Sequence, residues 1–92
     1  MEFEWDENKN ESNKRKHGVS FQDAISAFFD EHSISRVDTR KDYGEERIQI
    51  LGMSDIGVLI VAFTERYENT IRIISARTPS KRERRCYELG YF

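Results

Sequence analysis

The side chains best suited to chemistry on a charged substrate are guanidinium groups near the end of the chain. Between residues 72 and 85 the sequence holds six bases and a single acid, Glu83. The six bases are Arg72, Arg77, Lys81, Arg82, Arg84 and Arg85. A guanidinium group can bind two phosphate oxygens at once, so this segment suits a ligand that carries phosphate. The alternative is a solvated helix face together with two strand ends.

A second set of polar side chains recurs at helical spacing near the start of the chain. Its members fall at i, i+3, i+7, i+10 and i+11, which is one helix face: Asp6, Lys9, Asn13, Lys16 and His17. Imidazole exchanges a proton readily near neutral pH, so His17 suits acid–base catalysis. The alternative is a solvated helix whose basic last turn compensates the helix dipole, with His17 capping the last carbonyl groups.

Further candidates lie within the expected strands or at their ends: Glu46, Arg47, Arg66, Arg72, Ser75 and Arg77. Ser75 and Arg77 are two residues apart and therefore share one face of a strand. Neighbouring strands would bring several guanidinium groups together, an arrangement that favours phosphate binding between them. Trp5 flanks a short expected strand, a position where tryptophan more often belongs to the core. We assign Cys86 and Tyr87 to packing.

Composition limits the class of protein. The 92 residues, 37% hydrophobic and 35% charged with a net charge of −2, predict a single domain over residues 1–92. A lone cysteine cannot form an internal disulfide, and the longest apolar run, residues 58–63, is too short to cross a bilayer. With no signal-peptide pattern, we expect a cytoplasmic protein. No phosphate-binding loop or zinc-ligand spacing is present, so we expect no metal and no cofactor.

The hydrophobic pattern predicts an α+β fold with a small antiparallel sheet. We expect strands at residues 3–5, 34–38, 47–53, 58–63 and 71–76, with 58–63 in the centre. A first helix without apolar side chains is expected between Asp6 as N-cap and Gly18 as C-cap, either weak or tethered by its flanking residues. An apolar face then predicts a helix over residues 21–29, with Ser20 and Asp23 as its capping box. A third helix begins after either Thr78, with Pro79 in the first turn, or Ser80, with Glu83 as its capping partner.

Several of these segments, in this order and spacing, resemble the BrnT toxin family. The opening segments are Phe3-Glu4-Trp5-Asp6, Lys9, Asn13 and Lys16-His17-Gly18-Val19-Ser20-Phe21. The later ones are Gly44-Glu45-Glu46-Arg47, Leu51-Gly52, Phe63-Thr64-Glu65-Arg66, Ile71-Arg72-Ile73-Ile74-Ser75-Ala76-Arg77 and Arg82-Glu83-Arg84-Arg85 with Tyr87. The resemblance covers residues 3–87. Pro79-Ser80-Lys81 departs from it, where the family has a more basic helix start without proline.

The resemblance implies a RelE-like ribonuclease toxin of a type II toxin–antitoxin system, which inhibits translation in bacteria. It implies a BrnA-like antitoxin as partner, contact with DNA only through that antitoxin, and metal-free attack of an RNA 2′-hydroxyl on the adjacent phosphate. In that chemistry Arg72 and Arg77 would clamp the phosphate, Glu46 or His17 would be the base, and Lys16 or His17 the acid. Further RNA contacts would come from Trp5, Lys9, Arg47, Arg66, Ser75 and Arg82.

Two other functions remain open at this stage. The chain would be a non-catalytic protein-binding module if its basic face served only to hold an acidic partner. It would be a DNA-binding regulator if that face met a duplex, although no helix-turn-helix spacing is present.

Overall fold

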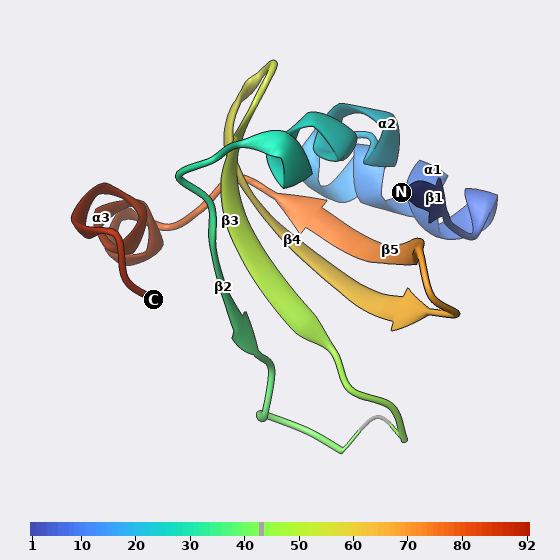
Figure 1. Cartoon of the computed structure of the whole chain (residues 1–92). Coiled ribbons are helices and arrows are strands. Elements are labelled where there is room, and N and C mark those ends of the chain that lie inside the picture. Colours follow the sequence, from blue (N-terminus) through green and yellow to red (C-terminus); the bar gives the residue numbers. More distant parts are fainter. Residues whose placement is uncertain (43) are drawn as a thin grey trace.

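A five-stranded sheet with helices on both sides makes up the fold (Figure 1). The computed structural model describes residues 1–42 and 44–92. The elements in chain order are β1 (Glu2–Glu4), α1 (Glu7–His17), α2 (Phe21–Ala24), the 3₁₀ helix η1 (Ile25–Phe29), β2 (Ile34–Val37), β3 (Ile48–Ser54), β4 (Gly57–Arg66), β5 (Thr70–Arg77) and α3 (Lys81–Leu89). The α+β class is confirmed.

The strand order is β1-β5-β4-β3-β2, which places β4 in the centre as expected. β2 to β5 pair antiparallel, but β1 runs parallel to β5, with Phe3 opposite Ile71. The prediction of an antiparallel sheet is therefore wrong at this edge, and the sheet is mixed. No tight turn joins β1 to a neighbouring strand, because two helices follow it, so turn geometry does not fix its direction.

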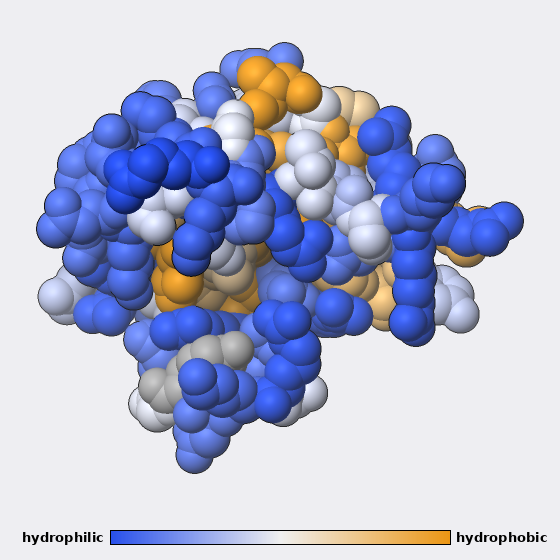
Figure 2. Space-filling model, turned by 180° about the vertical axis from the view of Figure 1, so that it is seen from behind, coloured by the Kyte–Doolittle hydropathy of each residue, from blue (hydrophilic) through white to orange (hydrophobic). Residues whose placement is uncertain are grey.

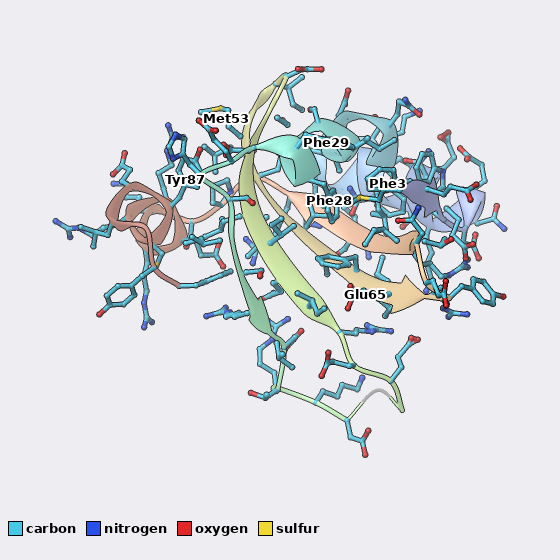
Figure 3. The ribbon with its side chains drawn as sticks, in the orientation of Figure 1. Phe3, Phe28, Phe29, Met53, Glu65 and Tyr87 are labelled. Atoms are coloured by element: carbon cyan, nitrogen blue, oxygen red, sulfur yellow. The ribbon has the colours of Figure 1, made fainter. Side chains whose placement is uncertain are left out.

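One face of the sheet is covered by α1, α2 and η1 and carries the main core; we call it the helix-covered face. Its core residues include Phe21, Leu59, Val61 and Ile73, each at most 1% exposed. Phe28 completes this core, with its ring centroid 5.2 Å from Phe3 and 5.0 Å from Phe63. Figure 3 shows Phe3 and Phe28 pointing toward one another across this face.

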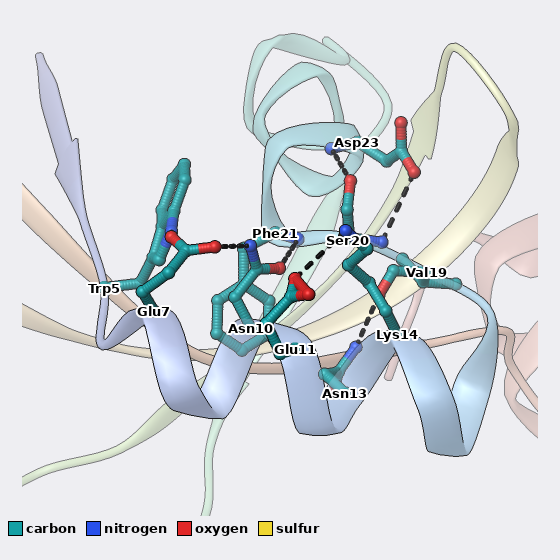
Figure 4. A network of polar contacts seen from close by, with 10 residues as sticks. All are labelled: Trp5, Glu7, Asn10, Glu11, Asn13, Lys14, Val19, Ser20, Phe21 and Asp23. Atoms are coloured by element: carbon teal, nitrogen blue, oxygen red, sulfur yellow. Dashed lines mark hydrogen bonds and ion pairs between the residues drawn. The ribbon is translucent and has the colours of Figure 1, made fainter.

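Buried amides tether α1, which has no apolar side chain. Asp6 caps its start and Gly18 ends it in the left-handed conformation (φ 70°), both as predicted. Asn10 accepts a hydrogen bond from the backbone N–H of Phe21 (2.8 Å), as Figure 4 shows. Asn13 donates to the carbonyl oxygens of Val19 (2.9 Å) and Ala76 (2.7 Å) and accepts from the Ala76 N–H (3.2 Å).

The second helix departs from the single α-helix expected over residues 21–29. The capping box of Ser20 and Asp23 is present as predicted, but the helix tightens to 3₁₀ geometry from Ile25. The tighter winding breaks the i, i+4 alignment of the apolar face, and Phe29 is 66% exposed. Here η1 lies directly against β3: a Cβ on Gly52 would lie 2.4 Å from a backbone carbonyl oxygen of η1.

On the other face of the sheet, α3 covers one end. The predicted alternative that Ser80 caps α3, with Glu83 completing a capping box, is confirmed. A small cluster holds the helix down, made by Ile34, Leu51, Val58, Ile60, Cys86, Tyr87 and Phe92. The Tyr87 hydroxyl also donates to Asp30 (2.6 Å), which lowers the pKa of the Asp30 carboxyl. The expectation that Cys86 and Tyr87 pack is confirmed.

The face of the molecule seen from behind is mostly hydrophilic (Figure 2). Seen from behind, polar residues cover most of the view, and apolar atoms show at the upper end, where the β3–β4 hairpin reaches in Figure 1 (Figure 2). Ile56 in this hairpin is 54% exposed. Among residues 1–42 and 44–92, no helix has the length and apolar content needed to cross a membrane.

Candidate active site

A β-bulge in β5 brings the two principal arginine candidates to the same face of the sheet. Arg72 and Arg77 are five residues apart, so an unbroken strand would point them to opposite faces. The register shifts between Ala62 and Phe63 on β4, which leaves Ile74 as an extra residue in β5. Arg72 then lies opposite Thr64, and Arg77 lies opposite Ile60. Thr64 and Ile60 both point away from the helix-covered face, so the two arginines do as well.

These two arginines belong to what we call the open face, the part of the second sheet face that α3 leaves uncovered. Strand alternation and register assign eight residues to it: Arg36, Arg47, Gln49, Ala62, Thr64, Arg72, Ser75 and Arg77. Four of the eight are arginines, contributed by β2, β5 and the residue before β3. The open face is therefore a mostly polar surface that carries four guanidinium groups.

Acidic and aromatic side chains hold most of these guanidinium groups in place. Arg72 donates to Glu4 of β1 (2.8 Å), and Arg77 donates two hydrogen bonds to Glu83 of α3 (2.8 and 3.0 Å). Arg36 bonds Gln49 (3.0 Å), and its guanidinium carbon lies 3.9 Å from the centre of the Phe92 ring. These contacts fix the positions of positively charged groups that would otherwise repel one another.

The pairing of Arg77 with Glu83 is electrostatically strong. The hydrogen bonds from Arg77 lower the pKa of the Glu83 carboxyl to about 2, and Glu83 in turn raises the pKa of Arg77. Arg40 pairs with the buried Asp38 (2.9 Å), lowers its pKa to about 2, and lies near enough to Arg77 to oppose its charge. A substrate phosphate at Arg77 would therefore compete with a bound carboxylate.

Three predicted residues of α1 meet β5 in one hollow. Lys9, Lys16 and His17 line it together with Ser12, Asn13, Ile74 and Ser75, and its volume is about 200 Å³. Ser75 also belongs to the open face, between Arg72 and Arg77 along β5. The hollow thus places two cations and an imidazole beside β5, but neither Arg72 nor Arg77 lines it.

Glu46 lies elsewhere, at the end of the sheet where β3 begins and β4 ends. It lines a hollow of about 500 Å³ with Glu45, Ile48, Thr64, Glu65 and Arg66. Arg66 pairs with Glu45 at 3.5 Å. His17, Arg72 and Arg77 do not line this hollow, so the two candidate bases, Glu46 and His17, occupy separate places.

The remaining predicted contacts are spread over the molecule. Arg47 is half-buried on the open face, and Arg82 is exposed on α3. Trp5 packs its ring against Phe21 (6.0 Å between centroids) and bonds Glu7 (3.1 Å), so core packing accounts for its position. In the described part of the chain, no three His, Cys, Asp or Glu side chains gather as a metal site requires.

Sequence reasoning missed four polar members of this region. Strand alternation places Gln49 on one face with Arg47, but it was not chosen as a candidate. Arg36 lies on β2, and only the pairing of β2 with β3 brings it to the same face. The carboxylates that hold the arginines, Glu4 and Glu83, gave no such signal because their partners lie 68 and six residues away.

Comparison with known proteins identifies the family. Residues 5–83 match the family model described as "Ribonuclease toxin, BrnT, of type II toxin-antitoxin system". The crystal structure of the Brucella abortus ribonuclease toxin BrnT superposes with a TM-score of 0.59 at 25% identity, covering 88% of this chain and 99% of that one. A search of curated proteins finds no match. The chain belongs to the BrnT family of ribonuclease toxins of type II toxin–antitoxin systems.

Proposed function

We propose that this chain cleaves RNA without a metal ion, by attack of a 2′-hydroxyl on the adjacent phosphate. The observation that carries the proposal is the β5 bulge, which turns Arg72 and Arg77 to one open face. Guanidinium groups can stabilise the negative charge that builds on the phosphate oxygens in the transition state. The groups gathered on this face are therefore of the kind that metal-free phosphoryl transfer needs.

The reaction needs two proton transfers, one from the attacking 2′-hydroxyl and one to the departing 5′-oxygen. A base takes the proton of the 2′-hydroxyl, whose oxygen bonds to phosphorus while the bond from phosphorus to the 5′-oxygen breaks. An acid protonates that 5′-oxygen, which leaves a 2′,3′-cyclic phosphate and a 5′-hydroxyl. Glu46 or His17 would be the base, and Lys16 or His17 the acid. His17 and Lys16 line the hollow beside Ser75, and Glu46 lines the hollow that contains Thr64, the register partner of Arg72.

Binding of RNA requires the arginines to change partners. Arg72 and Arg77 would exchange Glu4 and Glu83 for phosphate oxygens, and the carboxylates would keep them extended until then. Further RNA contacts would come from open-face and neighbouring cations: Lys9, Arg47, Arg66 and Arg82. Stacking of a base on Trp5 would use the part of the indole ring face that packing against Phe21 leaves open.

The toxin–antitoxin assignment implies an antitoxin, and we propose that this partner is BrnA-like. It would neutralise the toxin in the cytoplasm and carry the only DNA contact of the complex. We further propose a RelE-like arrangement of the site and inhibition of translation as the result of RNA cleavage.

An RNA-cleavage assay with purified protein tests the proposal. We expect cleavage to persist in EDTA, and Arg72→Ala/Arg77→Ala to reduce it by at least about 100-fold, since one oxyanion donor is typically worth about 10²–10³ in rate. Lys14→Ala/Arg15→Ala is the matched control, because it removes the same charge from exposed positions on α1. Full activity of the Arg72/Arg77 variant, or loss of cleavage in EDTA, would refute the mechanism. A protein-binding module or a DNA-binding regulator would leave RNA intact in every sample.

A further inference from the structure

Thr64 carries a buried hydroxyl group that has no hydrogen-bond partner in the described part of the chain. The residue is 2% exposed, and among residues 1–42 and 44–92 no group hydrogen-bonds its Oγ1. Buried hydroxyl groups are nearly always paired, because an unpaired one has lost its bonds to water without replacement. An unpaired hydroxyl in a folded protein therefore needs an explanation.

Packing does not supply that explanation. Valine has nearly the same shape as threonine and suits a strand at least as well, and β4 already uses Val58 and Val61 at other positions. A valine at position 64 would fill the same space without burying a polar atom. The hydroxyl is thus a cost to the free protein.

The position of Thr64 links two parts of the candidate active site. On the open face it lies opposite Arg72, its register partner on β5. It also lines the hollow of about 500 Å³ that contains Glu46 and Arg66. A phosphate held by Arg72 over the centre of the sheet would come within reach of this hydroxyl.

We propose that Thr64 is a substrate-contacting residue whose hydroxyl donates a hydrogen bond to the RNA phosphate bound by Arg72. The donor stays unpaired in the free protein and gains its acceptor when RNA binds. Arg72 is drawn toward Glu4 at the sheet edge in the free protein (2.8 Å), and its release from Glu4 would let the guanidinium group and its phosphate move over Thr64, the register partner of Arg72. This inference rests on the proposed RNA cleavage.

Three single substitutions test the role of the hydroxyl. Thr64→Val keeps the shape and removes the hydroxyl, and Thr64→Ser keeps the hydroxyl and removes the methyl group. Thr70→Val is the control, because Thr70 is a half-buried threonine at the start of β5 outside the proposed site. For each variant we would measure kcat/KM for RNA cleavage and the melting temperature.

We expect Thr64→Val to lower kcat/KM by roughly ten- to a hundredfold, the loss typical of a hydrogen bond to a charged group. Its melting temperature should equal or exceed that of the wild type, because a buried unpaired group has been removed. Thr64→Ser should retain most of the activity, and Thr70→Val should match the wild type.

Each other outcome overturns the inference. Wild-type activity in Thr64→Val would show that RNA does not use the hydroxyl. A lower melting temperature in Thr64→Val would show that the hydroxyl has a structural partner, and equal losses in Thr64→Ser and Thr64→Val would implicate the methyl group. Absence of cleavage by the wild type, or full activity of Arg72→Ala/Arg77→Ala, would remove the proposed function itself, which separates that failure from the failure of Thr64.

Discussion

Substituting Asn13 by alanine tests how a helix without apolar side chains is held to the fold. Asn13 is 6% exposed and reaches Ala76 at a point of β5 beyond the last residue paired with β1. Its amide accepts from the N–H and donates to the C=O of Ala76, as a neighbouring strand would, and it also donates to the Val19 carbonyl. The side chain thus joins α1, the segment before α2 and the free edge of β5.

The expected loss follows from the number of hydrogen bonds. Three buried bonds disappear, and a typical one contributes about 1 kcal/mol, so Asn13→Ala should lower the free energy of unfolding by about 3 kcal/mol. For a domain of this size the whole free energy of unfolding is on the order of 5–14 kcal/mol. At about 4–8 °C for each kcal/mol, the melting temperature should fall by roughly 12–24 °C.

Urea denaturation followed by circular dichroism measures this loss. Lys14→Ala is the control on the same helix: its ion pair with Glu11 is half-exposed, and its removal should cost less than about 0.5 kcal/mol. Asn13→Asp should be at least as damaging as alanine at neutral pH, because its carboxylate would face the Val19 and Ala76 carbonyls. A loss below about 1 kcal/mol for Asn13→Ala would refute the view that this amide anchors α1.

Three further predictions concern stability. Gly52→Ala should lower the free energy of unfolding by more than about 2 kcal/mol in urea denaturation, because the new Cβ would lie 2.4 Å from a carbonyl oxygen of η1. Tyr87→Phe should cost about 1 kcal/mol in the same assay, because it removes the 2.6 Å hydrogen bond to Asp30. Because Arg77 lowers the pKa of Glu83 from its ordinary 4.5 to about 2, their pairing should stabilise the fold fully above pH 4.5 and progressively less as the pH falls toward 2. Acid titration of the melting temperature checks this, since Glu83→Gln should lack that component.

Local signals in the sequence predicted the ends of the helices well. Asp6, Ser20 and Ser80 cap helices as expected, because a cap depends on residues two or three positions away. Gly18 ends α1 in the left-handed conformation as predicted, because glycine adopts this conformation without strain. Gly90 ends α3 in the same way, but this end was not predicted. Features that depend on contacts between distant residues were harder to predict from the sequence. The change to 3₁₀ geometry at Ile25 is one of them, because it occurs where η1 meets β3.

The candidate site was predictable in its residue types but not in its geometry. Strand alternation placed Ser75 and Arg77 together, but it separates Arg72 from them, and only the bulge at Ile74 restores Arg72 to the same face. The alternation of side chains along a strand gives no indication of where a bulge will occur. Asn13 shows the same limit, because its spacing fitted a solvated helix face, whereas its amide is buried against the edge of β5.

The acidic balance of the chain is compatible with a cationic RNA site because the acids and bases are arranged in pairs. Arginines brought together on the open face would destabilise the free protein by mutual repulsion. Glu4 and Glu83, from β1 and α3 at the margins of that face, offset this repulsion and fix the guanidinium groups. Net charge counts both members of each pair, but in the mechanism we propose a phosphate at the open face would meet guanidinium groups that exchange one oxyanion for another. A net charge of −2 therefore says little about this surface. The pattern of ion pairs describes it better, because it shows which carboxylates Arg72 and Arg77 hold.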